Sequence, residues 1–356
     1  MGGHSGDDPQ LLYFFERLSF KKHLHWRYDA KMTLLSLLFA LLMEQVHPLK
    51  QDSWVLRAQG QWAQFISKQL DTGHEKHTGL IWGLCVGLPA AFALVVYWLL
   101  WTFLGWVLAG VWCVMVLYAT LGFRQFSHHF TDIKEAFEAG DDALAREKLA
   151  QWKQIDTSQL NKNELTSLVI EYSVLAAHQH VFGVLFWFSM GAAFGLGPAG
   201  AVVYRLSHLL SKMWQHSELS NPGAQGSVSE GLSRTAANAW SKVDWLSARA
   251  TALSFAVVGN FEDAIECWRN HSALSPDDND GVVLCATSGA LNIRLGIVPS
   301  SPMAKEDAAI REAEQELTVF RAVQPQHLRS VVGLVWRTVL MWMVLLTLLS
   351  LSRLLG

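Results

Sequence analysis

Histidines and carboxylates that could bind a metal ion lie in two polar segments of this sequence. A helix would place His128, Asp132 and Glu135 on one face, at a spacing that permits metal coordination. The same residues fit a polar helix beside a membrane, and the pattern favours this plainer interpretation. The acidic turn at 277–281 resembles a calcium-binding loop, but Thr287 stands where such a loop needs a bidentate glutamate. We therefore predict no resident metal ion and no resident cofactor.

A second set of polar side chains flanks an apolar segment at residues 181–204. His178 lies seven residues after Glu171, so a helix would place both on the same side. Arg205 and His208 follow the segment at its other end, and a straight helix would keep the two pairs a membrane apart. A proline and several glycines within the segment could instead break it, fold it back as a re-entrant segment and bring the four side chains together. Both arrangements are open.

Arg249 lies in a stretch with helical spacing and apolar neighbours, so we predict that its guanidinium group is anchored. A buried guanidinium needs a carboxylate or several carbonyl groups as partners. Asp244, five residues earlier, is the near candidate, and Glu171 is the distant one. We therefore expect a structure to show Arg249 with partners and not fully exposed.

The elements that must position these residues are membrane helices. Apolar residues make up 51% of the 356 residues and charged residues 17%, against about 25% charged residues in a soluble domain. The 46 residues between His77 and Arg124 contain no Asp, Glu, Lys or Arg, and one crossing needs roughly 20 apolar residues. The net charge of −3 does not favour nucleic acid as a partner, so the lipid bilayer is the predicted one. We predict an all-α, polytopic membrane protein.

Hydropathy divides the chain into four to five spanning segments and the helical loops between them. In chain order we predict a basic N-terminal extension (1–31), a first apolar segment (32–48), a polar loop (49–77), a transmembrane hairpin (78–123), a helical loop (124–180), a transmembrane or re-entrant segment (181–204), a large helical loop (205–330) and a C-terminal transmembrane helix (331–356). The basic extension and the basic loop cannot both be cytoplasmic if the first apolar segment crosses the membrane. We therefore expect translation to begin at Met32; alternatively, this segment lies in the interface.

Three motifs in order resemble a known superfamily. Residues 197–205 read GPAGAVVYR, residues 243–252 read VDWLSARATA and residues 288–296 read SGALNIRLG. Together they resemble the CobD/CbiB adenosylcobinamide-phosphate synthases of cobalamin assembly and the related AmpE proteins. The resemblance implies a multi-pass protein of a bacterial inner membrane, with a corrinoid or another small molecule as ligand. With the residues that flank 181–204, the matching positions form the candidate ligand site or residual active site: Glu171, His178, Arg205, His208, Asp244, Arg249, Asn279 and Asp280.

The resemblance to the synthases predicts their activity only in part, because this chain lacks several of their polar residues. The synthases have an Asn and an Asp where His208 and Ser211 stand, and a Glu where Leu284 stands. Joining a corrinoid carboxylate to an amine at the expense of ATP needs magnesium held by carboxylates, so these replacements weaken that chemistry. We therefore favour a catalytically degenerate, AmpE-like protein in sensing, regulation or partner binding. The alternatives are a working amide-forming synthase, which would need magnesium and ATP, and a structural scaffold.

Overall fold

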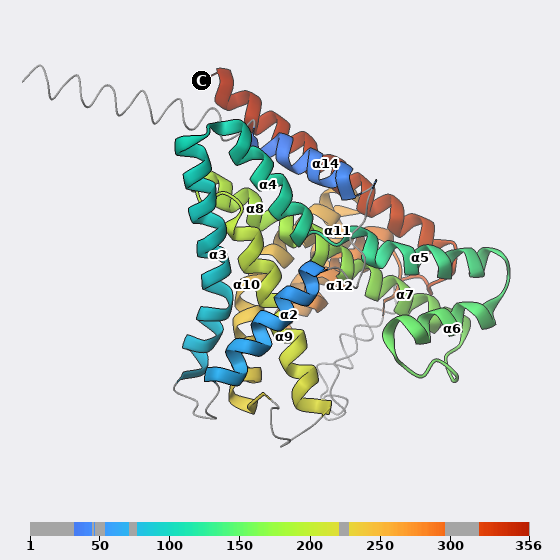
Figure 1. Ribbon diagram of the computed structural model, residues 1–356. Coiled ribbons are helices and arrows are strands. Elements are labelled where there is room, and N and C mark those ends of the chain that lie inside the picture. Colours follow the sequence, from blue (N-terminus) through green and yellow to red (C-terminus); the bar gives the residue numbers. More distant parts are fainter. Residues whose placement is uncertain are drawn as a thin grey trace, which may run out of the picture.

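Helices form the regular structure of the residues that this computed structural model describes, which are 32–44, 46, 54–70, 77–220, 228–295 and 320–355. After an apolar helix at Met32–Glu44, the helices are α2 (Trp54–Leu70), α3 (Thr78–Phe103), α4 (Trp106–Thr120), α5 (Phe123–Glu138), α6 (Asp142–Lys153), α7 (Lys162–Ala177), a π-helical turn (His178–Phe182), α8 (Gly183–Ala193), α9 (Ala199–Ser220), α10 (Glu230–Val258), α11 (Phe261–Leu274), α12 (Asn279–Leu291) and α14 (His327–Leu355). Figure 1 shows them packed into one bundle, from which α5 and α6 project as a lobe. The basic extension at 1–31 lies outside the described residues.

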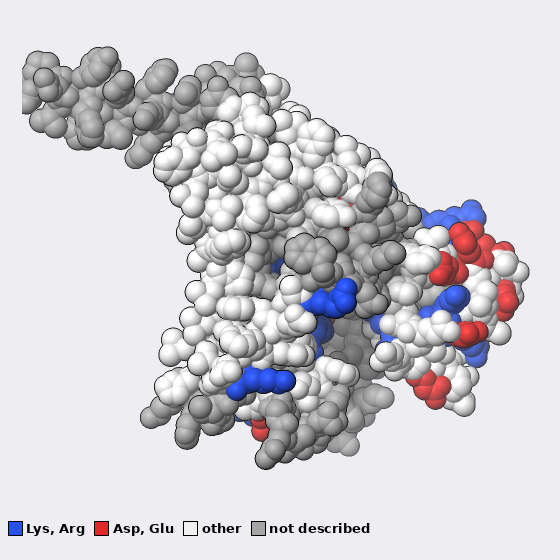
Figure 2. Space-filling model, in the orientation of Figure 1, with Lys and Arg blue, Asp and Glu red and all other residues white. Residues whose placement is uncertain are grey.

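Three helical runs are long and apolar enough to cross a membrane. They are α3, the continuous run Lys162–Ala193 and the part of α14 at His327–Ser352. The helix Met32–Glu44 and α4 are apolar but shorter. Outer side chains of these helices are exposed and apolar, for example Phe103 at 76% and Leu340 at 61% exposure, and Figure 2 shows little charge on the upper body. Such a surface suits contact with lipid, and the predicted fold class, a polytopic helical membrane protein, is confirmed.

The apolar segment at 181–204 is not one straight helix. α8 ends at Ala193, and α9 begins at Ala199 and runs back alongside it (Figure 1). In the connection, Gly195 and Gly197 have φ of 72° and 53°, which residues other than glycine rarely adopt. Of the two arrangements that the sequence left open, the structure has the folded-back one.

The polar stretch at 205–330 packs into the bundle over its described part. α9 continues to Ser220, and α10 then packs against α9, α12 and α3. α11 and α12 approach closely because Gly289 has no side chain, since a Cβ atom there would lie 2.4 Å from the backbone of Ala264. Asp278 caps α12 by accepting a hydrogen bond from the Gly281 amide at 2.9 Å. This packing brings α12 against α7 and α10 against the π-helical turn.

The α5–α6 lobe is polar, and side chains cap the starts of α6 and of the following helix, α7. Asp141 caps α6, and Asn161 with Glu164 forms a capping box at the start of α7. Acidic and basic side chains gather on this lobe in Figure 2. His128 pairs with Asp132 at 3.3 Å, and the described part of the chain holds no group of three His, Cys, Asp or Glu side chains suited to a metal ion.

Candidate functional site

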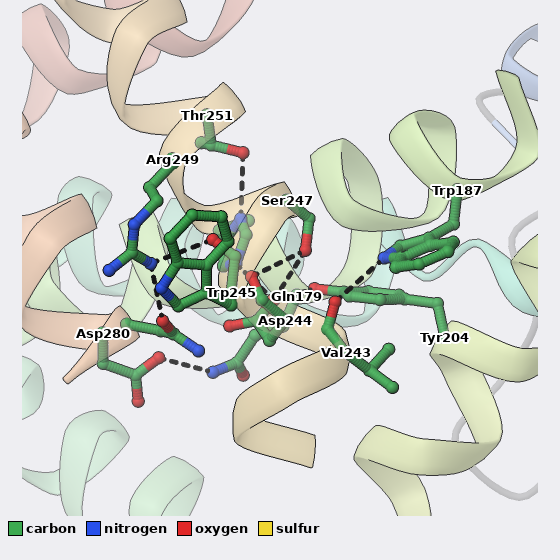
Figure 3. Close-up of polar contacts among 12 residues, drawn as sticks. Gln179, Trp187, Tyr204, Val243, Asp244, Trp245, Ser247, Arg249, Thr251 and Asp280 are labelled. Atoms are coloured by element: carbon green, nitrogen blue, oxygen red, sulfur yellow. Dashed lines mark hydrogen bonds and ion pairs between the residues drawn. The ribbon is translucent and has the colours of Figure 1, made fainter. Parts of the chain in front are cut away.

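A fully buried carboxylate, that of Asp244 on α10, lies at the centre of the candidate site. Its Oδ1 atom accepts hydrogen bonds from Tyr204 Oη, Ser247 Oγ and His178 Nε2, each at 2.9 Å (Figure 3). These donors come from α9, from α10 itself and from the π-helical turn. Asp244 therefore ties together three segments that are distant in sequence.

The π-helical turn positions His178 between two residues of α10. A π-helical turn holds more residues than an α-helical one, and such turns often occur at functional sites. His178 Nδ1 lies 3.0 Å from Thr251 Oγ1, so both ring nitrogens have partners. Tyr204 fits against the same run of helix because Gly183 has no side chain; a Cβ atom there would lie 2.1 Å from Tyr204 Oη. Close helix packing thus fixes the rings around Asp244.

The surroundings of Asp244 favour its ionised form. Burial opposes ionisation, but the interaction with His178 and the hydrogen bonds from His178, Tyr204 and Ser247 outweigh it and hold the pKa of Asp244 below its usual value. The other oxygen, Oδ2, is buried and has no hydrogen-bond partner among the described residues. A buried oxygen of an ionised carboxylate without a donor is a position that a ligand can fill.

Asp280, in the first turn of α12, is a second carboxylate within electrostatic reach of Asp244. Its Oδ1 accepts a hydrogen bond from Gln179 Nε2 at 3.2 Å (Figure 3). Burial and the negative charge of Asp244 raise the pKa of Asp280. The two carboxyl groups therefore differ: Asp244 stays ionised, whereas Asp280 holds a proton more readily, as in many acid–base sites.

Arg205, His180 and His208 form a second polar cluster beside the first. Arg205 Nη1 contacts His180 Nδ1, and the rings of His180 and His208 lie 5.6 Å apart. Trp240 links the clusters, because its ring lies 5.1 Å from that of Tyr204 and 4.8 Å from that of His208. Arg205 and His208 are only 5% and 8% exposed, yet Arg205 Nε and His208 Nε2 have no hydrogen-bond partner among the described residues. The donor Arg205 Nε and the ring nitrogen His208 Nε2 are also suited to bind a ligand.

Arg249 is anchored, but not by the carboxylates that the sequence suggested. Its guanidinium donates to Asn279 Oδ1 and to the carbonyl oxygens of Trp245 and Pro276, each at 3.0 Å, and lies 4.0 Å from the centre of the Trp245 ring. Asp244 is not its hydrogen-bond partner, because five residues at 100° each turn the two side chains to different faces of α10. Arg249 therefore connects α10 to the loop before α12 through Pro276 and to the start of α12 through Asn279.

The structure brings seven of the eight candidate residues to this region. The seven belong to the two clusters or to the α10–α12 contact beside them: His178, Arg205, His208, Asp244, Arg249, Asn279 and Asp280. Glu171 is half-buried on α7 and accepts a hydrogen bond from Ser167 Oγ at 2.8 Å. The folded-back hairpin of α8 and α9 is what unites the residues on either side of 181–204.

Comparison with known proteins decides the family. The sequence pattern described as CobD/Cbib protein matches residues 34–335. The chain belongs to the CobD/CbiB family. It is similar to a protein named cobalamin biosynthesis protein CobD from Stutzerimonas stutzeri (strain A1501), with 29% identity over 322 residues that cover 88% of this chain and 96% of that protein.

Two further relatives in the CobD/CbiB family carry the same name and match shorter stretches. The one from Chromobacterium violaceum is 31% identical over 183 residues, 51% of this chain and 54% of that protein. The one from Leptospira interrogans (strain Fiocruz L1-130) is 26% identical over 200 residues, 54% of this chain and 59% of that protein. No solved structure matches the chain.

Several residues of the site were missed in the sequence. Tyr204, Ser247 and Thr251 lie inside two of the motifs that resemble the CobD/CbiB family, but nothing in their spacing pointed to Asp244 or His178. Gln179 and His180 were visible as polar neighbours of His178 at the edge of an apolar segment. Three adjacent polar side chains in such a place indicate a ligand-binding or proton-handling role as the alternative to a seat at the membrane interface, because burying them requires partners.

Magnesium, which the CobD/CbiB resemblance implies, does not fit the described residues. Magnesium needs oxygen ligands in a near-octahedral arrangement. One oxygen of Asp244 already serves three donors, and His208 and Ser211 stand where the synthases have an Asn and an Asp. The positive charge of Arg205 also acts on this place. The described part of this chain therefore does not supply a magnesium cage of its own.

Replacing Arg249 with methionine should loosen the contact between α10 and α12. The variant loses hydrogen bonds to Asn279 and Pro276 while keeping most of the apolar stem, and we expect a loss of about 1–2 kcal/mol of folding free energy. Thermal unfolding in detergent measures this. Arg234→Met on the same helix is the matched control, because its ion pair with Glu230 is exposed and contributes only about 0.5 kcal/mol. Equal losses in the two variants would contradict the anchoring role.

Proposed function

We propose that this protein is an enzyme of cobalamin biosynthesis that joins a carboxylate of a corrinoid to an amine, with ATP supplying the energy. Its similarity over nearly its whole length to a protein named for cobalamin biosynthesis supports the proposal. The observation that carries it is the meeting of Tyr204, Asp244 and Asp280, from three distant segments, around one buried polar site. Burying ionisable groups in a membrane protein costs free energy, so their presence in one place indicates a function. On this proposal the protein lies in a bacterial inner membrane.

The two carboxylates have separate roles in the proposed reaction. Asp244, ionised and held in place by three donors, binds the ammonium group of the amine through its open Oδ2 atom. Asp280, whose pKa is raised, accepts the proton that the nitrogen must lose. ATP first transfers its terminal phosphoryl group to the corrinoid carboxylate and leaves as ADP. The freed electron pair of nitrogen then forms the new C–N bond, the C–O bond to the phosphate breaks, and inorganic phosphate departs with the second proton that the nitrogen loses. Arg205 binds negative charge on that side of the site through its unpartnered Nε–H group.

A second candidate is the non-catalytic, AmpE-like role that the sequence favoured. One observation supports it: the replacement of metal-binding positions by His208, Ser211 and Leu284, together with the poor fit to magnesium. A ligand-binding or sensing protein would keep the buried cluster without needing a base. The names of the relatives support the enzyme more strongly than this role.

Genetic complementation with an Asp280 variant tests the proposed reaction. We expect this chain to restore corrinoid-dependent growth to a bacterial strain that lacks its own adenosylcobinamide-phosphate synthase. Asp280→Asn keeps the size of the side chain and an acceptor for Gln179 but removes the base, so amide formation in membranes should fall about a hundredfold or more. Glu262→Gln, an exposed change on α11, is the control and should behave like the unchanged chain.

The outcomes separate the two candidate functions. Unchanged activity in Asp280→Asn would contradict the role of this residue as base. If the unchanged chain accumulates in the membrane, binds a corrinoid and restores no growth, the proposed enzyme activity fails and the AmpE-like role is favoured.

A further inference from the structure

Two cysteines outside the candidate site lie on neighbouring helices that are joined by a short turn. Cys267 belongs to α11 and is partly exposed, whereas Cys285 belongs to α12 and is only 2% exposed. Both are free thiols, and neither takes part in the proposed reaction. Because α11 and α12 pack against each other, the register of the two helices decides whether the thiols meet.

Two glycines of α12 fix the register of this helix against α11. Gly289 lies against the backbone of Asp263, and a Cβ atom on the glycine would collide with it. Eight residues earlier in α12, Gly281 lies against the ring of His271, which comes eight residues after Asp263 in α11. The two contacts follow the helices in opposite directions, so α11 and α12 are antiparallel.

The two cysteines lie midway between these contacts. Cys267 is four residues, about one helical turn, from the α11 residue of either contact, and Cys285 is four residues from either glycine of α12. Side chains four residues apart share one face of a helix, so both thiols point into the α11–α12 interface at the same level. They share a hydrogen bond, which together with burial raises the pKa of Cys285.

The close approach of the helices suits a covalent bond between the two thiols. A disulfide needs Cα atoms roughly 4.4–6.8 Å apart and Cβ atoms directed at each other. The missing side chains of Gly281 and Gly289, one turn to either side of Cys285, let the two backbones come together at the level of the cysteines. A hydrogen bond of 3.1 Å from the Asn260 amide to the Ala290 carbonyl oxygen holds the far ends of the helix pair. The fold therefore positions the thiols before any bond forms.

We propose that Cys267 and Cys285 are a modification site, at which hydrogen peroxide forms a reversible disulfide between α11 and α12. Peroxide reaches Cys267 first, because this thiol is partly exposed. The sulfur of Cys267 is oxidised to a sulfenic acid, and the peroxide is reduced and leaves as water. Cys285 then loses its proton and its sulfur attacks that of Cys267; the S–S bond forms, the S–O bond breaks and a second water molecule leaves. A thiol reductant reverses the modification.

The disulfide would close a span that carries part of the candidate site. Residues 267–285 include the turn before α12 and the first turn of that helix, with Asn279 and Asp280. A disulfide restricts such a span mainly in the unfolded chain and so stabilises the folded one. In reducing compartments disulfides are usually transient and often serve in redox sensing. The oxidised form therefore holds α11, α12 and the carboxylate of Asp280 more firmly than the reduced form.

Peptide mapping of the purified full-length protein in neutral detergent tests the inference. The folded protein is treated with hydrogen peroxide, its remaining thiols are blocked during unfolding, and it is digested with trypsin. Cleavage after Arg249, Arg269 and Arg294 places the two cysteines in separate peptides, which a disulfide keeps joined. We expect mass spectrometry to find these peptides linked after oxidation and separate after treatment with a thiol reductant.

The unfolding temperature gives a second readout. Peroxide should raise it by roughly 5 °C, as the closing of a span of this length predicts. Cys267→Ala removes a partly exposed thiol at little cost to packing, so this variant should fold and show no rise; it also corrects for oxidation of methionine. Cys113→Ala on α4 is the control, since it removes a different thiol and should keep both the linked peptides and the rise.

Three outcomes would overturn the inference. The linked peptides could be absent from the treated folded protein, or Cys267 could be joined to a second chain instead of to Cys285. A linked protein that unfolds at a lower temperature than the reduced one would show that the helices must shift to form the bond. Growth in the complementation test does not bear on any of these readouts, so the failure of the proposed enzyme and the failure of the disulfide are distinguishable.

Discussion

Asp244→Ala should cost about 3–5 kcal/mol of folding free energy and abolish any activity, because it removes the acceptor of three buried donors. His178, Tyr204 and Ser247 would each lose a partner in a place that water reaches poorly, since His178 and Asp244 are fully buried. The three segments that Asp244 joins would then separate more easily. Unfolding of the purified protein in detergent, by heat or by denaturant, measures the loss.

Asp244→Asn and Glu262→Ala complete this experiment. Asparagine keeps one acceptor oxygen for the same donors but removes the negative charge. The Asp244→Asn variant therefore measures the contribution of the hydrogen bonds to stability apart from that of the charge. We expect an intermediate loss of stability and no binding of an ammonium group. Glu262 is exposed on α11, so its replacement should change stability by less than about 0.5 kcal/mol. A loss as small as this in Asp244→Ala would show that the cluster does not hold the segments together.

Gly200→Ala should disrupt the hairpin of α8 and α9. A Cβ atom at this position would lie 2.1 Å from the carbonyl oxygen of Trp187, which belongs to the backbone of α8 and cannot move aside alone. Overpacking of this kind costs about 1–3 kcal/mol and can exceed that where backbone must shift. The two helices would be pushed apart, and His180 would lose its contact with Arg205. We expect reduced accumulation in the membrane and a lower unfolding temperature in detergent.

Gly83→Ala is the matched control for the hairpin variant. Gly83 lies within α3, and a Cβ atom there would meet nothing within 4 Å. Alanine is the better helix former by roughly 0.5–1 kcal/mol, so this variant should be as stable as the unchanged protein or more so. If Gly200→Ala accumulates and unfolds like Gly83→Ala, the close contact between α8 and α9 does not determine the positions of the site residues.

The sequence by itself determined the class of the protein and most of its helices. An uncharged run as long as 78–123 cannot be accommodated outside a membrane, whatever its neighbours are. A cap such as Asp141 acts within one turn, so residues close in sequence are enough to reveal it. The motifs at 197–205 and 243–252 also indicated the family.

Only the tertiary structure decided how the candidate residues meet. The sequence allowed 181–204 to be straight or folded back, because a proline and glycines permit a break without requiring it. For Arg249 the sequence allowed a carboxylate or several carbonyl groups as partners. The structure has two carbonyl oxygens and Asn279, because five residues along the helix turn Arg249 away from Asp244. The contact between Arg205 and His180 depends on α9 folding back along α8. Contacts between distant segments depend on how helices pack, and local pattern carries no record of that packing.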